Sequence, residues 1–327
     1  MQRRDVLGLL AGMATTLTVP AIGHAQGKYP DRPVRLVIPF PPAGPTDIIG
    51  RMVAEKLTSV LGQQIVVDNK AGAAGSIGSA EVAKAKPDGY TLLFATSSTH
   101  ATNPSTFVKL PYDPVKDYAP VALICVNPLV LVTHPSMPDT LPGLIDLMKK
   151  NPGKYSYGSS GTGGITHFAG EMFKTMAGGL QVEHVPYRGS NPALQDTLAG
   201  NVAWMFETVS TTLQHHRTGK LRILGFAHTK RAAIAPDIPT IIEAGLPGYE
   251  AYTFNIIMAP AGTPQPIIDT LHAAYRKIMA DAALIKGLDD IAAVPYVDST
   301  PALAAKFVTD EITKWAPIIK ATGTKIE

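Results

Sequence analysis

The stretch that decides the fold is Val34-Arg-Leu-Val-Ile-Pro-Phe-Pro-Pro-Ala-Gly-Pro-Thr-Asp47. Its apolar, β-branched beginning, from Val34 to Ile38, has the length and composition of a buried strand. A Pro/Gly-rich turn follows, and Thr46 or Asp47 is suited to cap an amphipathic helix that ends near Leu61. Free backbone N–H groups and the positive end of a helix dipole meet in such a loop. Because ligands of open α/β sheets bind at this end of the strands, the sequence predicts an anion-binding loop.

The first residues have the features of an export signal. Arg3-Arg4 precedes an apolar stretch from Val6 to Val19, and small residues then lead to a cleavage site after Ala25. An apolar stretch of about 14 residues is too short for a membrane anchor, which needs roughly 20. We therefore expect an exported protein with its signal removed. The paired arginines leave open whether it uses the general secretory or the twin-arginine route.

Composition excludes several classes of protein. The chain has 29 basic and 26 acidic residues and no basic block, so nothing indicates nucleic-acid binding. Its single cysteine, Cys125, lies in an apolar run and is expected to be a buried small hydrophobe without a disulfide partner. A mature chain of about 300 residues exceeds the comfortable size of one core, which favours two lobes.

Strand-like and helix-like segments alternate along the chain, which is typical of an α/β fold with largely parallel sheets. The expected strands are Val34–Ile38, Ile65–Asp68, Thr91–Ala95, Val121–Val126, Leu129–His134, Tyr155–Ser159, Val182–Val185, Val202–Phe206, Leu221–Ala227 and Phe254–Ala259. The expected helices are Asp47–Leu61, Ser76–Ala85, Leu141–Asn151, Thr166–Ala177, Pro192–Ala199, Pro264–Ala280 and Pro301–Ala321.

Two crossings between lobes are expected from the placement of apolar runs. Two strand-like runs are separated only by Asn127-Pro128, and another returns after Pro247-Gly248. The predicted lobes are residues 26–126 plus 254–327, and residues 127–253. A cleft between lobes is a common ligand site, and paired crossing strands are a plausible hinge.

Hydroxyl-rich loops follow two of the expected strands. Gly158-Ser-Ser-Gly-Thr-Gly-Gly-Ile-Thr-His167 combines glycines that let the backbone turn inward with hydroxyls that can donate to a carboxylate. Thr162 stands where a nucleophile elbow requires glycine, and the third glycine of a dinucleotide fingerprint is missing. An ordinary glycine-rich turn is the alternative to ligand contact. Thr96-Ser-Ser-Thr-His100 echoes this loop in the other predicted lobe.

Two further segments are candidate ligand contacts. Tyr187-Arg-Gly-Ser-Asn-Pro192 leads into a helix, and we favour Gly189 and Ser190 over Arg188 as contacts to a second acid group. Glu207 ends an expected strand, where it can bind a ligand amine or hydroxyl, orient water, or simply bond to neighbouring backbone. The histidines are scattered, and His215-His216 point to different faces of a helix, so no metal site is predicted.

Six segments in the same order resemble the Bug family, the periplasmic solute-binding proteins of tripartite tricarboxylate transporters. They are Pro39-Phe-Pro-Pro-Ala-Gly-Pro-Thr-Asp47, Asn69-Lys-Ala-Gly-Ala-Ala-Gly-Ser-Ile-Gly78, Ala85-Lys-Pro-Asp-Gly-Tyr-Thr-Leu92, Leu110-Pro-Tyr-Asp-Pro-Val-Lys-Asp117, His184-Val-Pro-Tyr-Arg-Gly-Ser190 and Ala259-Pro-Ala-Gly-Thr-Pro264. The resemblance extends from Tyr29 to Glu327. The first loop departs from the family pattern, with Pro41-Pro-Ala43-Gly44 where two glycines are usual. The strand before Ala259 departs too, with Phe254-Asn-Ile256 where Trp-Phe-Gly is usual.

The resemblance implies a two-lobed Venus-flytrap protein in the periplasm that closes on a small organic acid, a mono- or dicarboxylate, aliphatic or aromatic. It implies delivery of the acid to membrane subunits of a transporter. Delivery to a membrane sensor is a further possibility that the sequence does not separate from this one, and we expect a monomer without cofactor. In similar proteins the loop matching Phe40–Asp47 approaches one carboxylate, partly through ordered water, and the loop matching Ser159–His167 holds the acid from the other lobe. The predicted ligand-binding residues are Phe40, Pro41, Ala43, Gly44, Thr46, Asp47, Ser98, Thr99, Ser159, Ser160, Gly161, Thr162, Gly163, Thr166, His167, Arg188, Gly189, Ser190, Glu207 and Phe254.

An exported α/β hydrolase or lyase acting on a small carboxylate is the alternative. It needs a nucleophile and a base, and Ser160 with His167 is the only pair that suggests one. The missing elbow and the lack of an orienting carboxylate argue against it.

Overall fold

The structure, a computed structural model, describes residues 29–327, and the predicted signal with its cleavage site after Ala25 lies outside the described residues. The strands are β1 (Val34–Ile38), β2 (Ile65–Asn69), β3 (Thr91–Thr96), β4 (Tyr118–Thr133), β5 (Ser156–Ser159), β6 (Glu183–Pro186), β7 (Trp204–Thr208), β8 (Arg222–Phe226), β9 (Tyr252–Pro260) and β10 (Val294–Pro295). The helices are α1 (Pro45–Leu61), α2 (Ser76–Ala83), α3 (Asn103–Thr106), α4 (Leu141–Lys150), α5 (Ile165–Met176), α6 (Ser190–Leu198), α7 (Val209–Arg217), α8 (Gln265–Met279), α9 (Ala282–Asp289) and α10 (Pro301–Thr322), with a 3-10 turn η1 (Ala73–Gly75) and a π-helical turn η2 (Ser98–Thr102).

The strands form one mixed sheet in the order β2-β1-β3-β9-β4-β7-β5-β6, with β8 and β10 also paired to β4. Strands β1, β2 and β3 are parallel, as are β5, β6 and β7. The central strands β9 and β4 run antiparallel to their neighbours. The predicted α/β class is therefore confirmed, but the expectation of largely parallel sheets is wrong at the centre, where long strands cross the molecule.

The two adjacent runs expected on either side of Asn127-Pro128 are one continuous strand, β4. Proline fixes its own φ at a value that extended backbone tolerates and pushes the preceding residue toward extended conformations, so the pair need not end a strand. The hydrogen-bonded partner of β4 changes at this point, from β9 at Pro128 to β7 and β8 from Leu129 and Val130 onward. The missing proline N–H therefore falls at the junction between two ladders.

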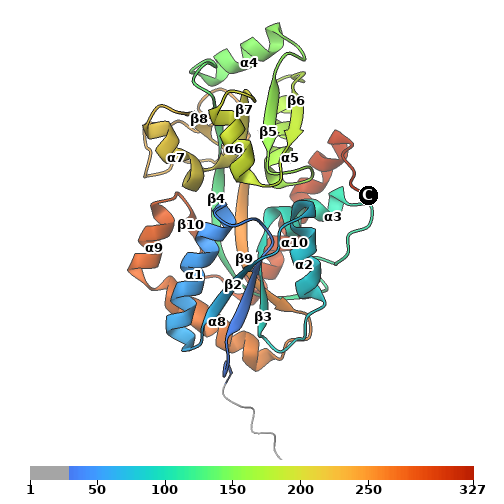
Figure 1. Ribbon diagram of the computed structural model, residues 1–327, viewed down its shortest axis with the longest axis vertical. Helices are drawn as coiled ribbons and strands as arrows, with labels where there is room; N and C mark the ends of the chain where they lie inside the picture. Colours follow the sequence, from blue (N-terminus) through green and yellow to red (C-terminus); the bar gives the residue numbers. More distant parts are fainter. Residues whose placement is uncertain (1–28) are drawn as a thin grey trace, which may run out of the picture.

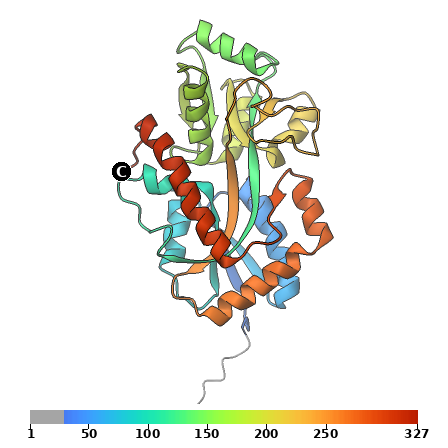
Figure 2. The same ribbon diagram turned by 180° about the vertical axis from the view of Figure 1, so that it is seen from behind.

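The elements gather into two groups joined at a waist by β4 and β9 (Figure 1). The lower group contains β1 to α3 and α8 to α10, and the upper group contains α4 to β8. Helix α10 runs behind the waist, against β4, η2 and α3, and the C-terminus lies at the waist (Figure 2). This arrangement supports the predicted lobes, 26–126 plus 254–327 and 127–253, whose boundaries stay a prediction.

One apolar cluster belongs to the lower group, and a larger one extends from the upper group across the waist into the lower group. In the lower group, Ile49, Val53 and Leu57 recur on one face of α1 and pack with α8 and the sheet. Burial of each such side chain contributes roughly 1.5–3 kcal/mol. In the upper group, Trp204 is fully buried and stacks on Tyr157 with ring centroids 4.5 Å apart. These cores hold the loops at the waist on rigid supports.

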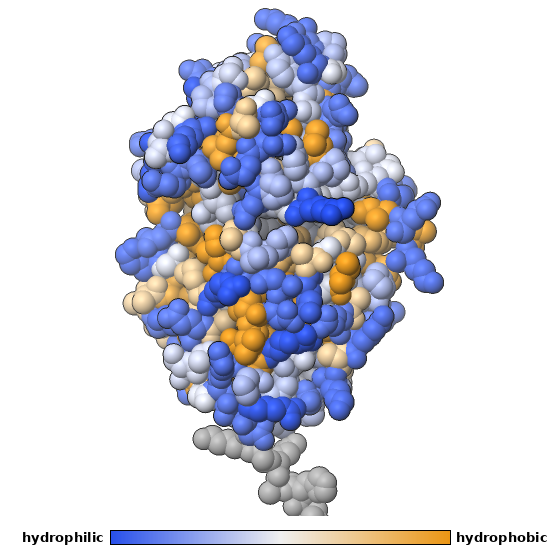
Figure 3. Space-filling model, viewed as in Figure 1, coloured by the Kyte–Doolittle hydropathy of each residue, from blue (hydrophilic) through white to orange (hydrophobic). Residues whose placement is uncertain are grey.

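Hydrophilic side chains dominate the face in Figure 3, and apolar residues appear there in small separated groups. Within residues 29–327, no helix combines the length and apolarity that crossing a membrane requires.

Candidate ligand-binding site

A cavity of about 60 Å³ lies between the lower and upper groups, which is room for a few water molecules and so for part of a small ligand. The lower group contributes the β1–α1 loop together with Thr96 and Ser98. The upper group contributes the starts of α5 and α6 and the end of β7, while Leu129 and Thr253 come from the crossing strands. The lining residues are Phe40, Pro41, Pro42, Gly44, Pro45, Thr46, Thr96, Ser98, Leu129, Ser160, Ile165, Thr166, Gly189, Ser190, Asn191, Pro192, Glu207, Thr208 and Thr253.

The β1–α1 loop places a helix N-terminus at the cavity, as predicted, but the helix starts earlier than expected. Gly44 is the N-cap residue and Pro45 the first helical residue, and no side chain caps the helix. The prediction that Thr46 or Asp47 caps α1 is therefore wrong. Proline is favoured at the first helical position because its missing N–H is unpaired there in any case. The first-turn N–H groups and the helix dipole make this end of α1 suited to an anion.

Asp47 holds the shape of this loop rather than the ligand. Its Oδ2 accepts the N–H of Ala43 and the Nε–H of Arg51, both at 2.9 Å, and its Oδ1 accepts from the amide of Asn69 at 2.9 Å. Burial raises the pKa of Asp47, but the hydrogen bonds from Arg51, Ala43 and Asn69 outweigh it and hold the pKa below its usual value. Ala43 adopts a left-handed φ of 60°, which normally favours glycine. The bond from Asp47 supports that conformation at the position where the family usually has glycine.

The β5–α5 loop bonds mostly within itself. Ser160 donates its N–H to Thr166 Oγ1 at 3.0 Å, and the two hydroxyl oxygens lie 2.8 Å apart. The hydroxyls of Ser160 and Thr166 thus reach the cavity from one rigid unit. Two bonds then cross between the groups: Ile165 N–H donates to Ser98 Oγ at 3.1 Å, and Thr102 Oγ1 donates to the carbonyl of Gly163 at 2.8 Å.

The start of α6 faces the start of α1 across the cavity. Gly189 has φ +114°, and a Cβ at this position would lie 3.0 Å from Pro41 Cγ in the lower group. Asn191 donates its side-chain N–H to the carbonyl of Ala43 at 3.3 Å. Ser190 is the first residue of α6, so its backbone N–H has no partner within that helix. Two helix N-termini, one from each group, therefore converge on the same small volume.

Among the residues that line the cavity, Glu207 is the only one with a titratable side chain. It is 1% exposed, and its Oε1 accepts from the backbone N–H of Thr208 at 2.8 Å and from Thr208 Oγ1 at 3.3 Å. Its Oε2 is buried without a hydrogen-bond partner in the described chain. Burial raises the pKa of Glu207, and the bonds from Thr208 oppose that rise together with the nearby Ser190 hydroxyl, which makes no hydrogen bond to the carboxyl group in the structure.

Half of the predicted site residues line this cavity: Phe40, Pro41, Gly44, Thr46, Ser98, Ser160, Thr166, Gly189, Ser190 and Glu207. A wider adjoining groove of about 620 Å³ is lined in part by Gly161, Thr162 and Arg188, and also by Lys325. Seven predicted residues line neither space: Ala43, Asp47, Thr99, Ser159, Gly163, His167 and Phe254.

The residues outside the cavity have identifiable structural contacts. Thr99 bonds to Thr96 and His100, and Phe254 packs on Phe307 in the core. Ser159 Oγ lies 2.6 Å from His184 Nε2. His167 Nδ1 accepts the N–H of Gly163 at 3.2 Å. These residues shape the loops that line the site.

The histidine rings of the upper group are stacked away from the cavity. The ring centroids of His167 and His184 are 4.0 Å apart, and His184 also stacks on Tyr157. Burial lowers the pKa of His167 to about 4 and that of His184 to about 3. Ser160, the partner considered for His167, bonds to Thr166 instead. In the described chain, no three His, Cys, Asp or Glu side chains are grouped so that they could hold a metal ion.

Residue-by-residue reasoning missed nine lining residues. Pro42, Pro45, Ile165, Asn191 and Thr208 are immediate neighbours of predicted residues, and Pro192 is two residues from Ser190, so the segments were predicted although these residues were not. Thr96 ends β3 directly before the predicted hydroxyls. Leu129 and Thr253 lie within the crossing strands, and only the packing of the two groups reveals them. Asn255 and Ile256, which depart from the family pattern, are buried outside the cavity lining.

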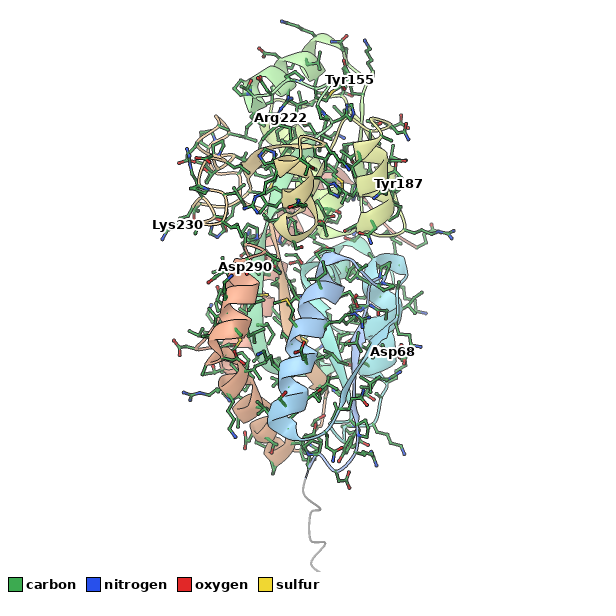
Figure 4. The ribbon with its side chains drawn as sticks, turned by 60° about the vertical axis from the view of Figure 1, so that its left-hand side comes forward. Asp68, Tyr155, Tyr187, Arg222, Lys230 and Asp290 are labelled. Atoms are coloured by element: carbon green, nitrogen blue, oxygen red, sulfur yellow. The ribbon has the colours of Figure 1, made fainter. Side chains whose placement is uncertain are left out.

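A second groove lies at the other edge of the waist, lined in part by Lys230 and Asp290. Figure 4 shows these two residues above and below the gap, opposite the side on which Tyr187 lies. The cavity is thus flanked by open grooves on both sides of the crossing strands.

Comparison with known proteins gives a consistent result. The model of the tripartite tricarboxylate transporter family receptor matches residues 49–324. Protein BugT of Bordetella pertussis is 37% identical over 301 residues, covering 91% of this chain and 92% of that protein. This confirms the family predicted from the sequence motifs.

Solved structures show the same fold. The periplasmic binding protein BugD superimposes with a TM-score of 0.86 at 32% identity, covering 91% of this chain and 100% of that one. An R. palustris protein solved with adipate superimposes with a TM-score of 0.86 at 34% identity, covering 91% of this chain and 99% of that one. MatC from Rhodopseudomonas palustris with bound malate superimposes with a TM-score of 0.84 at 31% identity, covering 89% of this chain and 100% of that one. The chain belongs to the receptor family of the tripartite tricarboxylate transporters.

Proposed function

We propose that this protein captures a small organic carboxylate in the cavity between its two groups and delivers it to membrane subunits of a tripartite transporter. The observation that carries the proposal is the convergence of the α1 and α6 N-termini on one cavity that contains no basic side chain. Helix N-termini bind anions through N–H groups and the helix dipole. Relatives solved with adipate and malate support the carboxylate class.

Hinge closure is the proposed mechanism. The bonds Ser98–Ile165, Thr102–Gly163 and Asn191–Ala43 join the lower and upper groups around the cavity. A ligand stabilises the closed form only to the extent that it binds that form better than the open one. A carboxylate held by N–H groups from both α1 and α6 binds the closed form better, because in the open form the lower or the upper group alone supplies only part of its hydrogen-bond donors.

We propose that this chain is a receptor without catalytic activity. We also propose that it is exported, cleaved after Ala25, and acts as a monomer in the periplasm. The alternative hydrolase requires Ser160 and His167 to act together. Their hydroxyl and ring bond instead to Thr166 and to the N–H of Gly163. Long incubation of a bound acid with the protein, followed by mass spectrometry, is expected to recover the acid unchanged, and its conversion would favour the enzyme.

A thermal-shift screen followed by titration calorimetry tests the binding proposal. The panel contains succinate, glutarate, adipate, malate, citrate, benzoate and phthalate, each with its primary amide as a matched neutral control. At least one acid is expected to raise the melting temperature by several degrees and to bind with about micromolar affinity, roughly 8 kcal/mol. Its amide is expected not to bind. Equal binding of acid and amide would contradict anion recognition.

A further inference from the structure

Glu207 is an unusual group for a site that binds anions. It ends β7 directly before Thr208, the N-cap residue of α7, and its side chain is buried against the cavity. One oxygen, Oε1, is engaged as an acceptor by Thr208. The other, Oε2, is buried with no hydrogen-bond partner in the described chain, and Glu207 is one of the residues that line the cavity. An unpaired buried carboxyl oxygen is costly, so it marks the position of a missing hydrogen-bond partner.

No cation in the lining offsets a negative charge on Glu207. The other lining residues are uncharged, and no charge–charge interaction contributes to the shift that burial imposes on the pKa of Glu207. Leu129 and Val130 of β4, which lie beside it, are apolar. The titratable or charged groups on the helices and loops packed around the cavity are Asp47, Arg51, Glu55 and Lys56 on α1, His100 on η2, His167, Glu171 and Lys174 on α5, Arg188 and Asp196 around α6, His215, His216 and Arg217 on α7, and Tyr252 on β9.

Most of these groups are engaged elsewhere. Asp47 is bonded to Arg51, and Asp196 to Tyr187. Glu171 is bonded to Lys174. The residues His215, His216 and Arg217 form the last turn of α7, at the opposite end of that helix from Glu207. A bound ligand can therefore supply the partner that Glu207 Oε2 lacks.

Among charged ligand groups, two satisfy a buried carboxyl group: a ligand cation beside ionised Glu207, or a ligand carboxylate beside protonated Glu207. The α1 and α6 N-termini favour an anion in the same small cavity. Two ionised carboxylates cannot share such a site without strong repulsion, and one of them then takes up a proton. A carboxyl O–H that donates to a carboxylate forms a short charge-assisted bond.

We propose that Glu207 is a specificity-determining residue that stays protonated in the complex and donates its Oε2 hydrogen to a ligand carboxylate oxygen. The inference rests on the proposed function and names its ligand class, acids that present a carboxylate rather than an ammonium group toward β7. Because the bound ligand holds the proton on Glu207, affinity is highest at low pH. It falls up to tenfold per pH unit between the pKa of Glu207 in the free protein and that in the complex.

Calorimetric titration from pH 5 to pH 8 tests this proposal. The probes are succinate, glutarate and adipate, each beside the amino acid in which CH2NH3+ replaces one carboxylate: 4-aminobutyrate, 5-aminopentanoate and 6-aminohexanoate. The Kd of the best diacid for the wild-type protein is expected to rise at least about tenfold across this range. Glu207→Gln, which imitates the neutral acid, is expected to keep binding the diacid, with a Kd that changes less than about twofold between pH 5 and pH 8. Glu183→Gln, an exposed acid-to-amide change on β6, is the matched control and keeps the wild-type profile.

A second measurement does not depend on any variant. Titrations of the wild-type protein in buffers of different ionisation enthalpy report proton uptake, and we expect a fraction of one proton per ligand near neutral pH. The proposal is overturned if Glu207→Gln keeps the wild-type pH profile, if no proton is taken up at any pH in the range, or if an amino acid binds more tightly than its diacid. If no acid in the panel binds at any pH, the proposed function itself fails, which is a different outcome.

Discussion

Thr102→Val tests whether closure of the two groups is part of binding. Thr102 is fully buried in η2 and does not line the cavity. Its hydroxyl donates to the carbonyl of Gly163 in the upper group at 2.8 Å, closer than the carbonyl of Ser98 in its own turn at 3.2 Å. Valine keeps the shape of the side chain but leaves that buried carbonyl without its donor. The cost of an unpaired buried carbonyl is about 1–3 kcal/mol. If the open form exposes Gly163 to water, the whole cost falls on the closed form.

A cost of about 1–3 kcal/mol on the closed form raises the Kd roughly 5- to 150-fold. Titration calorimetry with the acid found in the screen measures this change. Thr197→Val is the matched control, because Thr197 is equally buried but donates only to Ala193 within its own helix α6. Chemical denaturation of both variants shows whether they are folded. A Kd within twofold of wild type for Thr102→Val would refute the reasoning that this bond belongs to the closed form.

Three further predictions concern other parts of the site. Gly189→Ala is expected to lose about 1–3 kcal/mol of unfolding free energy from its strained φ and to bind more weakly. Gly219→Ala, also at positive φ but with open space around it, is expected to leave the Kd unchanged; equal Kd values for both variants would contradict the contact across the cavity. Arg188→Gln is expected to slow association severalfold at low salt and little at high salt, measured by stopped flow, since it removes an exposed cation from the adjoining groove. His167 and His184 are expected to remain neutral at pH 5 by NMR. Stability is then lost as pH falls from about 6.5 toward 4 for His167 and toward 3 for His184, because the unfolded chain takes up these protons first; protonated rings at pH 5 would contradict the lowered pKa values.

The fold was largely predictable because its signals are local. The strand Val34–Ile38 was predicted with the bounds that the structure shows; α10 begins at Pro301 as predicted, and α8 begins one residue after the predicted Pro264. Three helices, α3, α7 and α9, were not predicted as elements, since they are short and their patterns are weak. The continuity of β4 through Pro128 depends on which strands pair with it on either side. That pairing is a property of the tertiary structure and leaves no local signal.

The site was predictable at the level of segments and less so at the level of side chains. Strand-to-helix loops point to the correct edge of the sheet, and so Gly44, Ser190 and Ser160 were found. Sequence alone does not show which way a loop residue faces. Asp47 and Ser159 sit in the right loops, but their oxygens are taken up by Arg51 and His184. Conversely, Leu129 and Thr253 reach the cavity only because the crossing strands pass behind it.

A crystal structure of the complex tests the central claim most directly, using the acid with the largest thermal shift. The account predicts ligand density in the cavity between the two groups, with a carboxylate against the N-termini of α1 and α6 and an oxygen within hydrogen-bond distance of Glu207. Density in the outer groove beside Arg188, or at the groove lined by Lys230 and Asp290, with this cavity holding only water, would contradict it.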